Sequence, residues 1–236
     1  MEIELTVLVT TFQKERSIGQ CLVRLYEVLD RSGIRYKIVI LDDASTDATV
    51  EIARLALSEF VEIRKNEFNV GKGMMVKSFA RSIKSPYTAV FDGDLDLHPD
   101  FLVDAFRLIK RSPDIGAVIG SKLHSGSIVK YPLRRRILSY MFRRMTQCIF
   151  KLECSDSQTG AKVFRTDYLI DACSKSISTG FMFDLEVIIR LSRNNLEIRE
   201  APILLDYDFD SSISFKTCLN VGVDLFRVWK DLRKEN

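Results

Sequence analysis

Several common signatures are missing from this chain of 236 residues. Its five cysteines are odd in number and form no C-x-x-C pair, which argues against a disulfide framework or a zinc site and favours a reducing compartment. Two histidines are too few for a histidine-rich metal centre. No stretch approaches the ~18 consecutive apolar residues of a membrane span, and the chain opens on a predicted strand, not a cleavable signal. We expect a cytosolic protein or one lying on a membrane surface.

An excess of one charge sign is also absent. The net charge is +3, which is too weak to indicate a nucleic-acid-binding protein, so no nucleic-acid partner is expected. No internal repeat or low-complexity segment is present. Strand and helix patterns alternate through about residue 120, which predicts one α/β domain with an elaborated C-terminal third.

One apolar, strand-like run ends in three carboxylates at alternate positions, Asp92, Asp94 and Asp96. In an extended chain these side chains would share one face, and their mutual repulsion would favour a cation between them. Mg²⁺ or Mn²⁺ takes hard oxygen ligands and leaves room for substrate phosphates. The alternative is a solvated acidic turn ahead of a helix that starts near Pro99.

Two other predicted strands also end in polar residues. The run 36–41 leads into Asp42 and Asp43, and the run 3–9 leads into the segment 10–15. Helix-capping residues at 45–47 explain part of the first turn but not the two adjacent acids. Since open α/β sheets bind ligands at the carboxyl ends of their strands, we expect these three strand ends to converge on one site.

A short glycine-bracketed segment, Gly71-Lys72-Gly73, lies further along the chain. Its backbone could approach a phosphate closely while Lys72 supplies a positive charge. An ordinary turn with an exposed lysine would have the same composition.

Two segments in the C-terminal half have an amphipathic pattern. Between 131 and 152 a broad apolar stripe runs among arginines, which fits a core helix with a basic solvated face or a helix at a bilayer edge. Within it Arg135 and Ser139 lie one helical turn apart and could share one phosphate. The segment 215–232 predicts a second amphipathic helix that packs on the domain, lies on a membrane or docks a partner.

Taken in order, these segments resemble the motifs of the family 2 glycosyltransferases, and among them the polyprenyl-phosphate (dolichyl-phosphate) hexosyltransferases. The likeness covers nearly the whole chain. The matching segments are Val9 to Glu15, Asp42 to Thr49, Asn69 to Gly73, Asp92 to Asp96, Gly120 to Lys122, Pro132 to Ser139, Asp156 to Phe164 and Gly180 to Glu186.

The resemblance implies a GT-A fold, a Rossmann-like, mostly parallel central sheet flanked by helices, with amphipathic interfacial helices in the C-terminal half. Residues 1–236 would form one glycosyltransferase domain. Within it, 1–120 would bind the nucleotide sugar, 121–213 the acceptor with an interfacial helix at 131–152, and 214–236 would be a C-terminal amphipathic helix.

The resemblance also implies a role for each motif residue. Metal ligands for Mg²⁺ or Mn²⁺ would be Asp92, Asp94 and Asp96. The nucleotide sugar would be bound by Thr11, Glu15, Asp42, Asp43, Lys72 and Asp92. The acceptor phosphate would be bound by Lys122, Arg135, Arg136 and Ser139. Catalytic residues would be Lys72, Asp94, Asp184 and Glu186.

The expected activity is metal-dependent transfer of a hexose, with inversion, from a nucleotide sugar of the GDP-mannose or UDP-glucose type to a polyprenyl or dolichyl phosphate. The protein would associate peripherally with the cytosolic face of a membrane, where an integral-membrane subunit is a possible partner. A phosphate monoester, with a second pKa of about 6, needs no dedicated base.

Two alternatives stay open at this point. A family 2 glycosyltransferase that acts on a hydroxyl of a lipid-linked or cell-surface glycan would need a base, for which Asp184 or Glu186 is available. A non-catalytic nucleotide-sugar-binding protein could keep the pocket without turnover.

Overall fold

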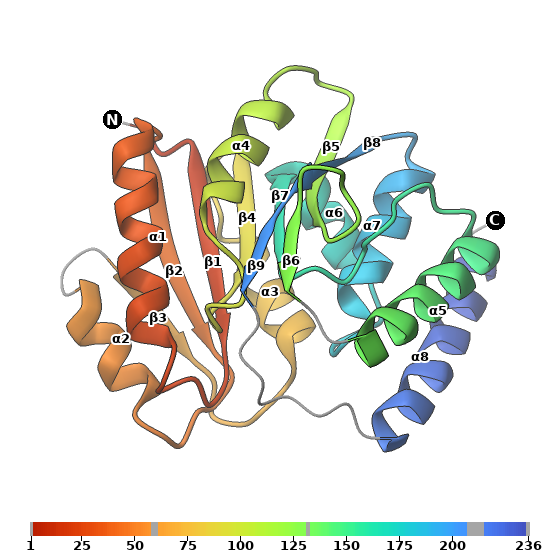
Figure 1. Cartoon of the computed structure of the whole chain (residues 1–236), viewed down its shortest axis with the longest axis horizontal. Coiled ribbons are helices and arrows are strands. Elements are labelled where there is room, and N and C mark those ends of the chain that lie inside the picture. Colours follow the sequence, from red (N-terminus) through yellow and green to blue (C-terminus); the bar gives the residue numbers. More distant parts are fainter. Residues whose placement is uncertain (1, 58–60, 131–132, 207–214, 235–236) are drawn as a thin grey trace.

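A seven-stranded sheet forms the centre of the computed structural model, which describes residues 2–57, 61–130, 133–206 and 215–234 (Figure 1). At 57, 130, 133–138, 206 and 215–221 only the backbone is described. The strand order is β3-β2-β1-β4-β7-β5-β8, and β7 runs antiparallel to both its neighbours while the other pairs are parallel. The strands are β1 (Leu5–Thr11), β2 (Tyr36–Asp42), β3 (Val61–Lys65), β4 (Tyr87–Asp92), β5 (Ile115–Ser121), β7 (Ala161–Arg165) and β8 (Glu197–Pro202).

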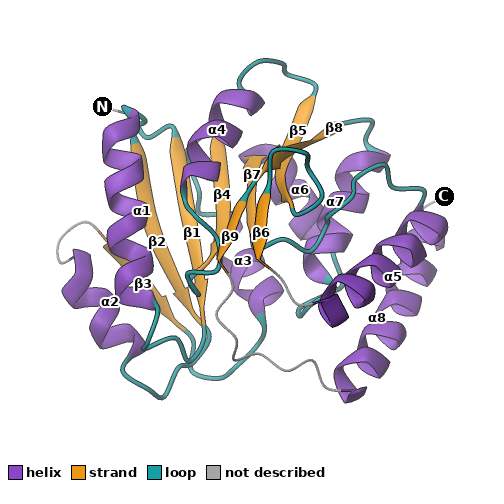
Figure 2. Ribbon diagram, viewed as in Figure 1, coloured by secondary structure: helices purple, strands orange, loops and turns teal. Residues whose placement is uncertain are grey.

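Helices cover both faces of this sheet (Figure 2). One core lies under α1 (Ile18–Ser32), α2 (Thr49–Leu57) and α4 (Asp100–Ile109). The other core lies under α3 (Lys72–Ala80), α6 (Thr166–Lys175) and α7 (Phe183–Arg193). A separate two-stranded parallel sheet pairs β6 (Ile128–Lys130) with β9 (Leu204–Asp206). The predicted mostly parallel α/β sheet flanked by helices is confirmed.

The local sequence explains these elements. All seven residues of β1 are buried, as expected for a parallel strand covered on both faces. The apolar positions of α1, including Leu22, Leu25 and Leu29, recur at helical spacing and are buried. Gly33 ends α1 in the left-handed conformation, with φ of 73°, which glycine adopts without strain.

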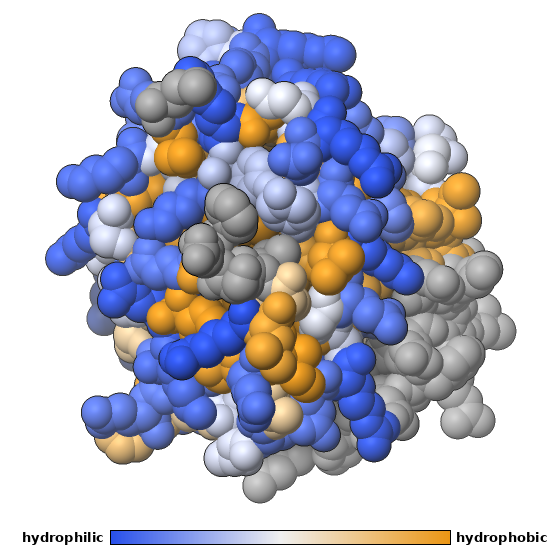
Figure 3. Space-filling view, turned by 90° about the vertical axis from the view of Figure 1, so that its left-hand side faces the viewer, coloured by the Kyte–Doolittle hydropathy of each residue, from blue (hydrophilic) through white to orange (hydrophobic). Residues whose placement is uncertain are grey.

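The surface on the side of α1 and α2 is largely hydrophilic, with smaller hydrophobic areas between the polar residues (Figure 3).

Three strand ends meet at one edge of the sheet, as the sequence predicts. Thr11 at the end of β1 pairs with Asp42 of β2, and Thr10 pairs with Asp92 of β4. The extended backbone stops at Asp92, however, and the chain turns through Leu95, which has φ of 68°. The shared face expected for alternate acids along one strand therefore does not form.

The two predicted amphipathic segments are helical: α5 (Leu133–Phe150) and α8 (Phe215–Lys234). In α8, Leu225, Val228 and Leu232 are buried in the second core, so this helix packs on the domain. Phe142 and Phe150 of α5 pack against the same core. Each helix also exposes apolar side chains, among them Met141, Met145 and Phe226. In the part of the chain that the structure describes, neither of these helices nor any other is apolar and long enough to span a membrane.

Overpacking at the start of α3 gives a test of the fold. A methyl group on Gly73 would lie 2.7 Å from Phe183 Cβ and 2.8 Å from the Thr179 carbonyl oxygen, so we expect Gly73→Ala to lower the free energy of unfolding. The expected loss is ~1–3 kcal/mol. In α8, Gly222 has no described atom within 4 Å of such a methyl group. Gly222→Ala should therefore be neutral or stabilising by ~0.5–1 kcal/mol. Urea unfolding measures both, and equal stability of the two variants would contradict the tight contact.

Candidate active site

Lys72, the first residue of α3, lies between two carboxylates. Its Nζ is 2.8 Å from Asp92 Oδ1 and 3.2 Å from Asp184 Oδ2. Asp92 ends β4, and Asp184 lies in the first turn of α7. Burial acts to lower the pKa of Lys72, but the two carboxylates outweigh it and hold that pKa above its ordinary value. Lys72 is therefore a fixed cation that joins α3, β4 and α7.

A second lysine, Lys162 on β7, contacts the other oxygen of Asp184. Its Nζ is 2.8 Å from Asp184 Oδ1 and also donates to the Thr159 carbonyl, and the side chain is 1% exposed. Burial lowers the pKa of Lys162, although Asp184 opposes the shift. For Asp184, burial acts to raise the pKa, but Lys162 and Lys72 outweigh it and hold that pKa below its ordinary value. Charges of alternating sign thus run from Asp92 through Lys72 and Asp184 to Lys162.

Sequence reasoning did not assign Lys162 to the site, although it lies in a matched motif. The available signal was a lysine inside the apolar run 161–164, since a lysine is almost never fully buried unless it is paired. The position of Asp92 also leaves no room for a side chain at Gly160 in the same motif. A side chain on Gly160 would overlap the Asp92 carboxylate, and the Gly160 carbonyl accepts a hydrogen bond from the Asp92 backbone N–H.

Asp94 and Asp96 lie in the turn after β4. Burial, and then the charge of Asp92, raise the pKa of Asp94 above its ordinary value. The backbone N–H of Asp96 donates to Asp94 Oδ1 at 3.3 Å. Among the described residues no three histidine, cysteine or acidic side chains come together as a ready-made metal cluster. The donor chemistry nevertheless fits a divalent cation, because Mg²⁺ is commonly held by one or two carboxylates together with substrate phosphates.

Asp43 holds the loop that precedes Lys72. Its Oδ1 accepts hydrogen bonds from Asn66 Nδ2 and Val70 N–H, and its Oδ2 accepts one from Gly71 N–H at 2.8 Å. The two glycines beside Lys72 make room for protein atoms. A Cβ on Gly71 would lie 2.6 Å from the Thr179 carbonyl oxygen, and one on Gly73 would meet the same oxygen. The structure thus gives these glycines a packing reason that differs from the predicted approach to phosphate.

Two buried oxygens at the paired ends of β1 and β2 have no hydrogen-bond partner among the described residues: Thr11 Oγ1 and Asp42 Oδ1. The other oxygen of Asp42 accepts the Ser45 N–H at 2.9 Å. Glu15, by contrast, is exposed and accepts a hydrogen bond from Ala48 N–H at the start of α2. Of the predicted nucleotide-binding residues, Thr11 and Asp42 therefore retain free hydrogen-bonding capacity.

The predicted acceptor-binding residues lie in a different part of the chain. Lys122 follows β5, and its Nζ is 2.8 Å from Asp156 Oδ2. Ser139 is half-buried on α5. The side chains of Arg135 and Arg136 lie outside the described residues.

Glu186 lies on α7, two positions after Asp184, and its hydrogen-bond partners differ from those of Asp184. It is fully buried, and both its oxygens accept hydrogen bonds, from the backbone N–H groups of Ile177 and Ser178 and from Arg190. Burial acts to raise the pKa of Glu186, but hydrogen bonds from this turn and from Arg190 outweigh it and hold the pKa below its ordinary value.

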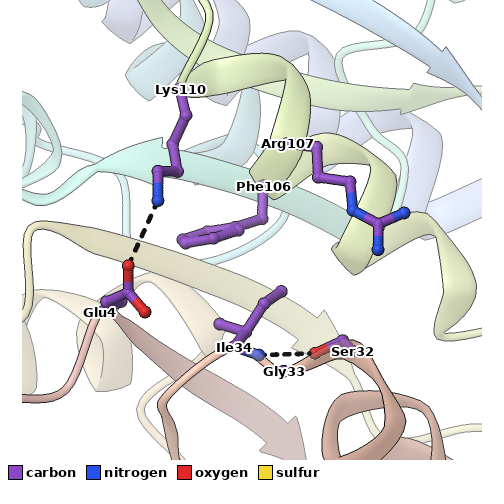
Figure 4. Close-up of a pocket in the computed structure, with 7 residues that line it drawn as sticks. All are labelled: Glu4, Ser32, Gly33, Ile34, Phe106, Arg107 and Lys110. Atoms are coloured by element: carbon purple, nitrogen blue, oxygen red, sulfur yellow. Dashed lines mark hydrogen bonds and ion pairs between the residues drawn. The ribbon is translucent and has the colours of Figure 1, made fainter.

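A cavity of about 320 Å³ lies at the opposite end of β1 from these groups (Figure 4). Lys110 points across it to Glu4, 3.2 Å away, and Phe106 lines its wall. β1 separates this cavity from Thr11 by seven residues, or roughly 20 Å of strand. None of the predicted site residues lines this cavity.

The chain belongs to glycosyl transferase family 2, whose family model matches residues 6–172. The dolichyl-phosphate beta-glucosyltransferase of Saccharomyces cerevisiae is 25% identical over 256 residues, covering 98% of this chain and 73% of the yeast protein. The low-salt glycan biosynthesis hexosyltransferase Agl6 of Haloferax volcanii is 29% identical over 204 residues, covering 84% of this chain. The chain spans 47% of the length of that second relative.

Solved structures share the fold at low sequence identity. Mannosyl-3-phosphoglycerate synthase from Rubrobacter xylanophilus aligns with a TM-score of 0.75 and 13% identity, over 99% of this chain and 75% of that one. Glucosyl-3-phosphoglycerate synthase from Mycobacterium tuberculosis, in complex with Mn²⁺, UDP and phosphoglyceric acid, aligns with a TM-score of 0.72 and 15% identity, over 98% and 77%. The fold is thus the GT-A type that the sequence resemblance implied.

The Asp184 carboxylate gives a test of the charge network. Asp184→Asn keeps the shape of the side chain but leaves Lys162 buried without a counter-charge, which should lower the free energy of unfolding by ~3–5 kcal/mol at neutral pH. Because the folded pKa of Asp184 lies below its ordinary value of 3.8, its stabilisation is present above that value and is lost as pH falls through the lowered pKa. The difference from the parent should therefore shrink in acid.

Asp171→Asn is the matched control, because Asp171 pairs with Lys175 on the surface, where both side chains are at least 40% exposed. Its effect should stay within ~1 kcal/mol. Thermal or urea unfolding at several pH values measures both variants, and an Asp184→Asn protein as stable as the control would refute the network.

Proposed function

We propose that this protein is an inverting glycosyltransferase that moves a hexose from a nucleotide sugar to a polyprenyl phosphate, with Mg²⁺ or Mn²⁺. The family match supports glycosyl transfer, and the yeast relative, named for dolichyl phosphate, supports a lipid phosphate acceptor. Complexes of the structural neighbours with UDP and Mn²⁺ support the donor class and the metal. The donor would be of the GDP-mannose or UDP-glucose type.

The donor would bind along the three adjacent strand ends. Thr11 and Asp42 offer unpartnered buried oxygens to a base or ribose: Asp42 Oδ1 can accept a hydrogen bond, and Thr11 Oγ1 can donate or accept one. Asp43 would hold the 66–71 loop so that Lys72 lies beside the pyrophosphate. Glu15, which accepts the Ala48 N–H, would hold the start of α2 next to the bound nucleotide. Asp92 and Asp94, with Asp96 close by in the turn, would hold the divalent cation that carries the diphosphate. When bound, that cation would neutralise the charge growing on the leaving group.

The acceptor assignment rests on one observation: both candidate bases, Asp184 and Glu186, are already held by ion pairs or hydrogen bonds within the protein. A general base for a hydroxyl works best with a pKa near the operating pH. Asp184 lies between two lysines and Glu186 is enclosed by donors, and both have a pKa below the ordinary value. A phosphate acceptor avoids the need for a base, because its oxygen is already ionised near neutral pH.

In the proposed reaction, a phosphate oxygen of the acceptor attacks the anomeric carbon as the bond to the nucleoside diphosphate breaks, which inverts the configuration. Lys72 would stabilise the departing diphosphate. Lys122 and Ser139, together with Arg135 and Arg136, would bind the acceptor phosphate. The exposed apolar residues of α5 and α8 would contact the membrane surface from which the lipid comes. An integral-membrane partner subunit remains compatible with this arrangement.

Replacing Asp94 should impair metal-dependent transfer without lowering the stability of the protein. Asp94→Asn should lower transfer at least 100-fold, since a metal-held leaving group is worth several kcal/mol. Without metal the variant should be no less stable than the parent, because the substitution removes a carboxylate whose charge Asp92 opposes. Transfer assays and calorimetry with Mn²⁺ and nucleotide test both points. Activity within tenfold of the parent at saturating Mn²⁺ would contradict the metal role.

The acceptor chemistry can be tested directly. Purified protein, a panel of UDP and GDP sugars and Mn²⁺ should glycosylate a short polyprenyl phosphate but not the matching polyprenol, with products identified by mass. Lys122→Met should raise the KM for the lipid phosphate several-fold and leave donor affinity unchanged, since the two substrates would bind different groups. Transfer to the alcohol alone would favour the hydroxyl-acceptor alternative, and donor binding without any turnover would favour a non-catalytic binding protein.

A further inference from the structure

The buried carboxylate of Glu186 joins α7 to the turn that precedes it. Its Oε1 accepts the N–H of Ile177 and its Oε2 accepts the N–H of Ser178, both at 2.9 Å. Ser176 Oγ donates to Oε2 at the same distance. A carboxylate with this many donors fixes the conformation of the turn 176–179.

The same turn contacts α3 at both of its ends. The Thr179 carbonyl accepts a hydrogen bond from Met74 N–H, in the first turn of α3, at 3.3 Å. Lys77 Nζ donates to the Ser176 carbonyl at 2.6 Å. Since α3 begins at Lys72, the contact at Met74 lies two residues from the point where the Lys72 side chain starts.

On its other side Glu186 is linked to the C-terminal helix. Arg190, one turn further along α7, is 3% exposed, and its Nη2 lies 2.8 Å from Glu186 Oε1 and 2.9 Å from Asp231 Oδ2 on α8. Arg193 Nη1 donates to the Leu232 carbonyl at 2.6 Å. Two arginines of α7 therefore hold the end of α8.

We propose that Glu186 is a positioning residue through which α8 sets the place of Lys72. The path runs from Asp231 through Arg190 to Glu186, and from there through the turn 176–179 to α3. Glu186 would then support the reaction without touching a substrate. The inference rests on the proposed function, because it is in that reaction that Lys72 would act on the leaving group.

The far end of this path can be changed without touching the site. Asp231→Asn keeps the side-chain shape and removes the charge that Arg190 contacts. Asp224→Asn is the control, because it neutralises another carboxylate of α8, one that forms an exposed ion pair with Arg227. We expect Asp231→Asn to lower kcat about tenfold with the donor KM within twofold, since small misplacements of a positioning group act on the chemical step. Nucleotide should still bind with one-to-one stoichiometry, and Asp224→Asn should match the parent.

Hydrogen–deuterium exchange gives a readout that does not depend on turnover. In Asp231→Asn the amides of 74–76 and 177–178 should exchange faster, while those of β1 and β4 should match the parent. Faster exchange throughout the chain, or unchanged exchange at 74–76, would overturn the coupling.

A double-mutant cycle tests whether the effect passes through Lys72. In a Lys72→Met background, Asp231→Asn should cause no further loss of activity. The same tenfold loss in that background would refute the path, and where residual activity is too low to compare, the exchange pattern decides. If the parent itself transfers no sugar to any acceptor, the proposed function fails, while the exchange experiment still tests the coupling.

Discussion

The ion pairs of Lys72 with Asp92 and Asp184 are the contacts on which the rest of the site depends. They join three elements that the chain forms far apart: a helix start, a strand end and a second helix start. Other side chains hold these groups in place. Thr10 donates a hydrogen bond to Asp92, Lys162 pairs with Asp184, and Asp43 accepts a hydrogen bond from the loop before Lys72. Lys162 and Asp184 are the most deeply buried of the ion-paired residues in this group, with side chains 1% and 11% exposed, so the loss of either one would leave an uncompensated buried charge.

The fold could be predicted from the sequence because its signals are local. Apolar runs of strand length alternate with helical spacing, and polar residues follow each of the first strands, so the adjacency of Asp42, Thr11 and Asp92 followed from the topology of a parallel sheet. The motif order then pointed to the family, which the match over residues 6–172 bears out.

The side-chain partners in the site could not be predicted in the same way. Lys162 and Asp184 are 22 residues apart, and no periodic pattern reports that their side chains meet. Glu186 lies two positions from Asp184, yet the helix turns it toward another part of the protein, so spacing alone could not separate a residue of the site from one that holds a turn. The prediction that the three acids share one face of a strand was wrong for a local reason, since the strand ends at Asp92 and Leu95 adopts a left-handed conformation.

The antiparallel strand β7 has a consequence for how the protein is made. It lies between β4 and β5, and β5 pairs only with β7 and β8 among the described strands, both of which come later in the chain. During synthesis the strands β1 to β4 can assemble first, but the edge of β4 keeps its peptide groups unpaired until Ala161–Arg165 emerges. A ribosome stalled before that point would present an open strand edge to other nascent chains, which is the geometry that favours aggregation.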